Sequence, residues 1–193
     1  MIRERSTPRS PLPVDAAAHA VFLTDVRAVL FDIYGTLLTS GSGDVGSAAG
    51  RAQDAAFARL LGDLLGVYLP SSESAPGHEA RQAYFQAIAD AHGTAREAGI
   101  DHPEVEIRSI WRTVCGRLAD AGHLTGMPDD SEIEKLALGY ELESNPVWPM
   151  PGAAEILRIL ADAGMPLGIV SNAQFFTPLL FPALFGAGVE ELG

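Results

Sequence analysis

The sequence contains one cysteine, one lysine and few basic residues of any kind. Cys115 has no partner for an intrachain disulfide and no second thiol for a metal cluster, which fits a reducing compartment such as the cytoplasm. The 193 residues carry 13 Lys and Arg against 25 Asp and Glu, so the formal net charge is −12. A chain with this balance lacks the surplus of cations that binding to a phosphodiester backbone needs. Nucleic acid is therefore not an expected partner.

Long apolar runs are also missing. The apolar stretch at residues 16–23 contains His19 and is far shorter than the roughly 20 residues of a membrane-spanning helix. Residues 1–15 carry arginines and prolines where a signal peptide would have its apolar segment, so we expect a flexible tail there and no membrane association. The hydrophobic fraction of 47% and the mean hydropathy of +0.14 are sufficient for a buried core.

Two short apolar runs predict parallel strands. Residues 27–32 end in a carboxylate, and residues 166–170 follow a helical pattern at 153–163. Strand, helix and strand in this order are typical of an α/β fold with a Rossmann-like parallel-sheet core. Asp32 would then lie at the carboxyl end of the first strand, with Ser171 and Asn172 at the end of the second. In open α/β sheets ligands bind at this edge.

A helical insertion separates the two strands. A glycine-rich link at 39–50 precedes apolar spacing from Phe57 that favours a helix, and further helices are expected over 78–98, from Pro103, and after Asp129 and Asp130. We therefore expect a tail at 1–15, an α/β core at 16–40 and 145–193, and an all-helical insertion at 41–144.

The residues after the first strand suit covalent chemistry on an anion. Asp32 is a candidate nucleophile, and the turn that follows has backbone N–H groups that can face an anion, with Gly35 permitting a close approach. Because a carboxylate is a weak nucleophile, it needs an aligned substrate and stabilisation of the charge that develops. Ser171 can donate one such hydrogen bond.

These residues resemble known motifs. Asp32-Ile-Tyr-Gly-Thr36 is similar to motif I of the haloacid dehalogenase superfamily, Ile169-Val-Ser-Asn172 to its motif II, and the intervening helix starts similarly, at Pro151-Gly-Ala. The resemblance implies a hydrolase with a helical cap that acts on a small acidic metabolite. It implies that Asp32 is the nucleophile, that Ser171 binds the phosphoryl or carboxylate group, and that Thr36 and Asn172 shape the site.

Tyr34 leaves two chemistries open. The phosphatase form of motif I has a second Asp at this position as general acid and base, and a phenol with a pKa of about 10 replaces it poorly. The Tyr form resembles the 2-haloacid dehalogenases, in which the carboxylate attacks carbon and no metal is needed. In the phosphatase branch Mg²⁺ would be held by Asp32, by the backbone carbonyl of Tyr34 and by later acidic residues.

The later motifs of the superfamily are not found. No Lys or Arg follows Asn172, Lys135 lies in the predicted cap, and the acids after Asn172 are Glu190 and Glu191. Two core strands also make a small parallel sheet, incomplete at the C-terminus. The expectation is an N-terminal part of a longer protein or a degenerate member. The alternative is a non-catalytic protein that binds a ligand or partner.

Each candidate also has a structural explanation. Asp32, Ser171 and Asn172 can be turn residues, and Tyr34 can pack across the site mouth. Asp44 and Arg112 are more simply a turn residue and a solvated side chain, and the five histidines lack metal-ligand spacing. Cys115 lies on an apolar helix stripe, which favours packing over catalysis. The substrate and the oligomeric state stay open.

Overall fold

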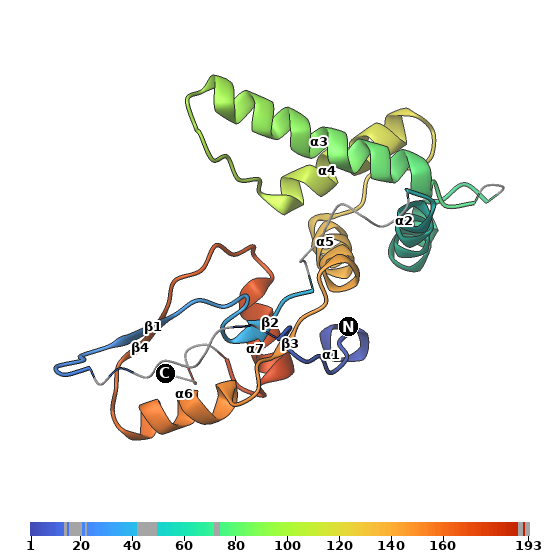
Figure 1. Ribbon diagram of the computed structural model, residues 1–193. Coiled ribbons are helices and arrows are strands. Elements are labelled where there is room, and N and C mark those ends of the chain that lie inside the picture. Colours follow the sequence, from blue (N-terminus) through green and yellow to red (C-terminus); the bar gives the residue numbers. More distant parts are fainter. Residues whose placement is uncertain are drawn as a thin grey trace. The chain divides into compact units, whose positions relative to one another are not determined.

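The computed structural model describes residues 1–13, 15, 21, 23–41, 50–71, 74–188 and 191 (Figure 1). The chain divides into two compact units. The core unit comprises Met1–Asp44 and Ser144–Gly193, and the helical unit comprises Val45–Glu143. Asp44 lies outside the described residues.

The core unit is built on a parallel strand pair. β1 (Val29–Phe31) pairs with β4 (Leu167–Ile169) in parallel, and α6 (Ala153–Asp162) connects to β4 as the crossover helix (Figure 1). A second, antiparallel pair joins β2 (Leu38–Thr39) to β3 (Trp148–Pro149). Both predicted strands are therefore present, and the predicted α/β class with a parallel sheet and a helical insertion is confirmed.

The helical spacing of Ile156, Leu157 and Leu160 predicts that all three face inward from helix α6, but the structure differs at Ile156. Ala153 and Leu157 are buried, but Ile156 is 42% exposed and Ile159 is 46% exposed. The inward orientation predicted for Ile156 is wrong, because a residue next to Leu157 is turned about 100° around the helix from it. Gly164 follows the helix end with a φ of 69°, the left-handed geometry expected of a glycine that caps a helix.

The amino-terminal residues differ in part from the expected flexible tail. Ile2–Arg5 forms the short helix α1, and the Arg3 side chain donates to the carbonyl of Ala183 in α7 (Thr177–Leu184). The hydrogen bond ties α1 to the carboxyl-terminal helix of the core unit.

The helical unit contains α2 (Gly50–Leu65), η1 (Gly66–Tyr68), α3 (Gly77–Glu97), α4 (Ile107–Asp120) and α5 (Asp130–Ser144). Its interior holds a cluster of four aromatic rings with centroids 4.7 to 5.9 Å apart, formed by Phe57, Tyr84, Trp111 and Tyr140. Helical spacing predicts one buried face on the third helix, and its five apolar positions are all buried: Ile107, Ile110, Trp111, Val114 and Leu118. None of the described helices is long and apolar enough to cross a membrane.

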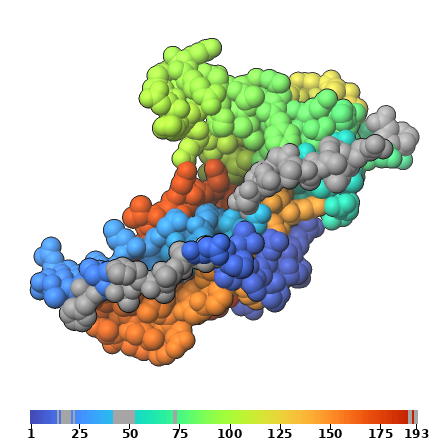
Figure 2. All heavy atoms as spheres, viewed as in Figure 1, coloured from blue at the N-terminus to red at the C-terminus, as the bar shows by residue number. Residues whose placement is uncertain are grey.

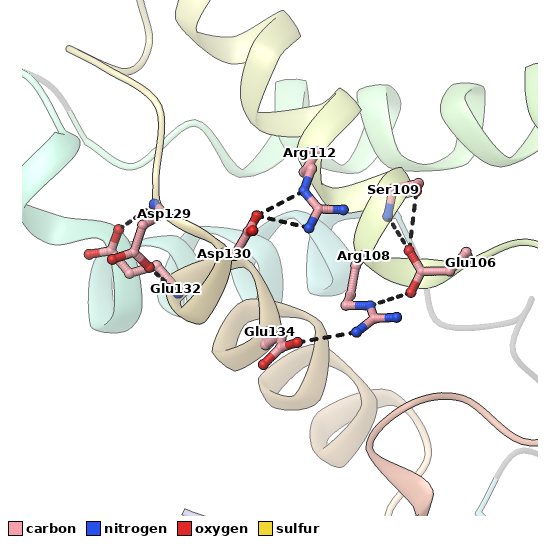
Figure 3. Close-up of polar contacts among 8 residues, drawn as sticks. All are labelled: Glu106, Arg108, Ser109, Arg112, Asp129, Asp130, Glu132 and Glu134. Atoms are coloured by element: carbon pink, nitrogen blue, oxygen red, sulfur yellow. Dashed lines mark hydrogen bonds and ion pairs between the residues drawn. The ribbon is translucent and has the colours of Figure 1, made fainter.

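Helix α4 begins later than predicted. Pro103 was expected in its first turn, but the helix starts at Ile107 after Glu106, whose side chain accepts a 2.9 Å hydrogen bond from the Ser109 N–H (Figure 3). Glu106 thus satisfies a donor of the first turn, which the proline cannot do. Because a helix N-terminus favours negative charge, the sequence predicts Glu106 at this position, and the structure confirms it.

Helix α5 begins with a capping box. Asp129 Oδ1 accepts from the Glu132 N–H at 2.9 Å, and Glu132 Oε2 accepts from the Asp129 N–H at 2.8 Å (Figure 3). Two backbone donors at the helix start are therefore satisfied reciprocally. Asp130 instead points to Arg112, with an Oδ1 to Nη2 distance of 2.8 Å.

We predict that Asp129→Ala lowers the free energy of unfolding by about 1 kcal/mol, since it removes the cap of α5. Urea unfolding followed by circular dichroism measures the change. Asp130→Ala is the matched control: its carboxylate is 82% exposed and makes a surface ion pair, for which a loss below about 0.5 kcal/mol is expected. Equal losses in the two variants would contradict the capping assignment.

The ion pairs of the Asp54 carboxylate make the stability of the helical unit depend on pH. The hydrogen bond from Arg81 lowers the pKa of Asp54 below its ordinary 3.8, against the opposing effect of burial, and His78 adds to the lowering. A depressed pKa contributes stability that is present above 3.8 and is lost as the pH falls through the folded-state value. We therefore expect wild-type unfolding free energy to fall more steeply below pH 3.8 than that of Asp54→Asn. Parallel pH profiles in chemical denaturation would refute this.

Candidate active site

Asp32 and Ser171 leave the sheet at the same edge. In the parallel pair Phe31 is aligned with Ile169, and the Val170 N–H donates to the Phe31 carbonyl at 2.9 Å. Asp32 follows β1 directly, and Ser171 follows β4 after one residue. Both therefore lie beyond the carboxyl ends of their strands, where α/β proteins bind ligands.

The side chains at this edge are available to a ligand. Asp32, Thr36 and Asn172 are exposed and Ser171 is half-buried. Among the residues that the structure describes, none donates a hydrogen bond to the Asp32 carboxylate, and none forms a hydrogen bond with the Ser171 hydroxyl. A carboxylate and a hydroxyl from neighbouring strands can thus both interact with a bound molecule.

The turn after Asp32 uses its own backbone donors. The Ile33 carbonyl accepts from the N–H groups of Thr36 at 3.2 Å and of Leu37 and Leu38 at 2.9 Å. The Gly35 N–H donates to the Leu38 carbonyl at 2.7 Å, and Gly35 has a φ of 85°, a left-handed conformation that favours glycine. The N–H groups of residues 35–38 therefore bond within the turn in this conformation and do not face an anion.

The Tyr34 phenol is held by a buried threonine. Its hydroxyl lies 2.9 Å from Oγ1 of Thr177, which is 1% exposed and begins α7. The bond joins the motif I turn to the helix that follows motif II. Thr177 was not singled out from the sequence, although its position just before Pro178 marks a helix start.

The segments that flank the helical insertion are clamped together within the core unit. Oγ1 of Thr39 donates to the Trp148 carbonyl and accepts from the Trp148 N–H, both at 3.0 Å. Oγ of Ser40 donates to Oδ1 of Asn145 at 2.8 Å, and the Met150 N–H donates to the carbonyl of Leu37 at 2.9 Å. This antiparallel clamp fixes the turn against the segment that returns from the insertion.

A small cavity of about 190 Å³ adjoins Ser171 and Thr177. Its remaining walls are mostly apolar and come from Ile33, Ile169, Ala173, Pro178 and Phe181. The volume is below the range of roughly 300 Å³ and above that is usual for drug-sized ligands. Only a short apolar group fits such a space.

The donors for a metal ion are few. Among the described residues no group of three or more His, Cys, Asp or Glu side chains is placed to hold one. The predicted Mg²⁺ ligands, Asp32 and the Tyr34 carbonyl, are two oxygen donors, whereas Mg²⁺ takes six ligands and commonly draws several from water and substrate. The described side chains do not by themselves form a magnesium site.

Other candidates from the sequence have structural roles. Arg112 binds Asp130, and His78 lies 3.2 Å from Asp54. Cys115 is buried in the helical unit, and burial raises the pKa of its thiol to about 12. Burial also makes a thiol a weak nucleophile, and the buried position of Cys115 confirms its assignment to packing.

The parallel strand pair, the strand-end carboxylate and the helical insertion define an α/β protein with an inserted helical unit. A family model for haloacid dehalogenase-like hydrolases matches residues 26–190, so the chain belongs to that family. Neither the curated proteins nor the solved structures that were searched gave a match.

We predict that the bond between Tyr34 and Thr177 contributes about 1 kcal/mol to stability, as is typical of a partly buried hydrogen bond. Tyr34→Phe and Thr177→Val each remove one partner with little change in shape. In a double-mutant cycle by urea unfolding, the double variant should be less destabilised than the sum of the two single variants. Strict additivity would show that the two hydroxyls do not interact.

Proposed function

We propose that this chain is a hydrolase in which Asp32 forms a covalent intermediate with a small anionic substrate. The proposal is carried by one observation: an exposed carboxylate without a described hydrogen-bond donor lies at the carboxyl end of β1, beside the strand that leads to Ser171. An exposed carboxylate at this position is accessible for attack on a bound substrate. Family membership supports the same chemistry.

In the proposed first step a carboxylate oxygen of Asp32 attacks the substrate and displaces the leaving group. With a 2-haloacid the attack falls on carbon 2, halide departs with the bonding electrons, and an ester of Asp32 forms. Water then adds to the ester carbonyl, releasing the 2-hydroxyacid and regenerating the carboxylate. The Ser171 hydroxyl donates a hydrogen bond to the anionic group of the substrate, and Thr36 and Asn172 border the site.

With a phosphate ester the same carboxylate would attack phosphorus, and the alkoxide leaving group would need a proton. The position that would hold the general acid is Tyr34, whose hydroxyl is engaged with Thr177. A phenol also donates its proton poorly at neutral pH. A halide leaves without a proton, so these residues favour the 2-haloacid over the phosphate ester. Mg²⁺, which the family commonly uses, belongs to the phosphatase alternative.

The cavity beside Ser171 agrees with a small substrate. Its volume of about 190 Å³ and its mostly apolar walls suit a short alkyl group, and Ser171 and Thr177 are its polar lining residues. We therefore propose short-chain 2-haloacids as the substrate class.

A non-catalytic, ligand-binding protein is the second candidate. The observation that favours it is the lack of any Lys or Arg after Asn172 in the sequence, together with the engaged N–H groups of the turn. With these backbone donors engaged and no cation in the sequence after Asn172, charge developing in the transition state is stabilised less.

The test is halide release from 2-chloropropionate and hydrolysis of an aryl phosphate, the latter with and without Mg²⁺. We expect Asp32→Asn to lower the rate of whichever reaction the wild type catalyses by at least about a hundredfold, because the nucleophile is lost. Asp162→Asn, an exposed carboxylate of α6 that pairs with Arg158, is the matched control and should retain activity. Full activity in Asp32→Asn would overturn the nucleophile assignment.

A single turnover in ¹⁸O-labelled water separates the two chemistries. If an ester of Asp32 is hydrolysed at its carbonyl, the label enters the Asp32 carboxylate, and mass spectrometry of the peptide detects it. If an aspartyl phosphate is hydrolysed at phosphorus, the label enters the released phosphate. Absence of turnover with both substrates in the wild type would favour the non-catalytic candidate.

A further inference from the structure

An anion at the motif I turn needs positive charge from elsewhere. The N–H groups of residues 35–38 bond within the turn, and the whole chain has a net charge of −12, which repels anions from its surface. A cationic side chain that the fold brings to this turn would supply the stabilisation that these four N–H groups do not.

Arg9 is such a side chain. It lines a cavity of about 380 Å³ together with the turn residue Gly35 and with Thr39 and Ser40 of the following segment. The other walls come from Ser10, Pro11, Leu12, Gly41 and Met150. Figure 2 shows the amino-terminal residues, in dark blue, on the surface beside the lighter blue residues near position 40. The cavity lies entirely within the core unit.

The position of Arg9 is defined by two further contacts. Its Nη1 donates to the Pro146 carbonyl at 3.2 Å, which attaches the amino-terminal segment to the segment returning from the insertion. A Cβ at position 41 would collide with the same nitrogen, so Gly41 makes the space that the guanidinium occupies. The side chain is thus held against the wall of the cavity.

The charge of Arg9 is also not neutralised by the protein. In the helical unit, Arg81, Arg112 and Arg117 each bind a carboxylate. In the part of the chain that the structure describes, Arg9 has no carboxylate partner, and its one hydrogen bond goes to a carbonyl. A guanidinium in this state retains donors for a planar or tetrahedral oxyanion.

We propose that Arg9 and this cavity form a binding subsite for the oxyanion group of a small ligand, either a carboxylate or a phosphate, beside the motif I turn. The identity of the ligand rests on the proposed function, but binding of an oxyanion does not require turnover. The cavity volume is within the roughly 300 to 1,000 Å³ of small-molecule sites, so a small organic acid or phosphate is accommodated. Ser40 lines the same space.

The test uses titration of the full chain with inorganic phosphate and, separately, with lactate, followed by amide chemical shifts and by calorimetry. We expect binding of at least one of the two, with the largest shift changes at Gly35, Ser40 and Gly41. Arg9→Gln should weaken binding at least about tenfold, the change expected when a charge-assisted hydrogen bond is lost. Comparing the affinity for phosphate with the affinity for lactate shows whether the subsite prefers a tetrahedral or a planar oxyanion.

Three variants make the test specific. Arg9→Lys keeps the charge and should bind more tightly than Arg9→Gln. Gly41→Val narrows the cavity beside the Arg9 guanidinium and should weaken binding while the charge is kept. Arg158→Gln, which removes an exposed arginine of α6, is the control and should bind as the wild type does.

Several results would overturn the subsite: no binding of either anion to the wild type, unchanged affinity in Arg9→Gln, equal losses in Arg9→Gln and Arg158→Gln, or shift changes confined to other surfaces. Asp32→Asn separates this proposal from the proposed function. If that variant keeps full turnover the nucleophile is wrong, whereas the subsite is judged by anion binding alone.

Discussion

The parallel pairing of β1 with β4 is the interaction on which the candidate site depends. Its register aligns Phe31 with Ile169, so the residues after both strands emerge at one edge of the sheet. Two motifs far apart in the chain meet there because hydrogen bonding between parallel strands fixes their relative position. The crossover helix α6 makes this pairing possible, since parallel strands need a long connection between them.

The turn that follows β1 shows how local hydrogen bonding limits chemistry. Ile33 has one carbonyl that receives three N–H groups, and Gly35 closes the turn in a left-handed conformation. This arrangement holds Asp32 and Tyr34 firmly but leaves the N–H groups of residues 35–38 unavailable to a ligand. Stabilisation of a bound anion therefore depends on side chains, namely Ser171 and, in our proposal, Arg9.

Much of the fold was predictable from local patterns. Apolar runs bounded by turn residues identified both strands, and helical spacing identified the buried face of α4. Two predictions were wrong: α4 starts at Ile107 after Glu106 and not at Pro103, and Ile156, expected inward together with Leu157, is exposed on α6. Which residue caps a helix, and which of its side chains faces the core, depends on the element that packs against the helix. A sequence pattern does not contain this information.

By itself, the sequence determined the α/β class, the helical insertion and the position of Asp32 at a strand end, because these follow from hydrophobic periodicity and motif order over short distances. Only the tertiary structure decided the partners that come from remote segments. Thr177 meets Tyr34 across 143 positions, and Arg9 meets Pro146 across 137. Such contacts are set by how elements pack in three dimensions, so single side chains far apart in the chain become neighbours without any local signal.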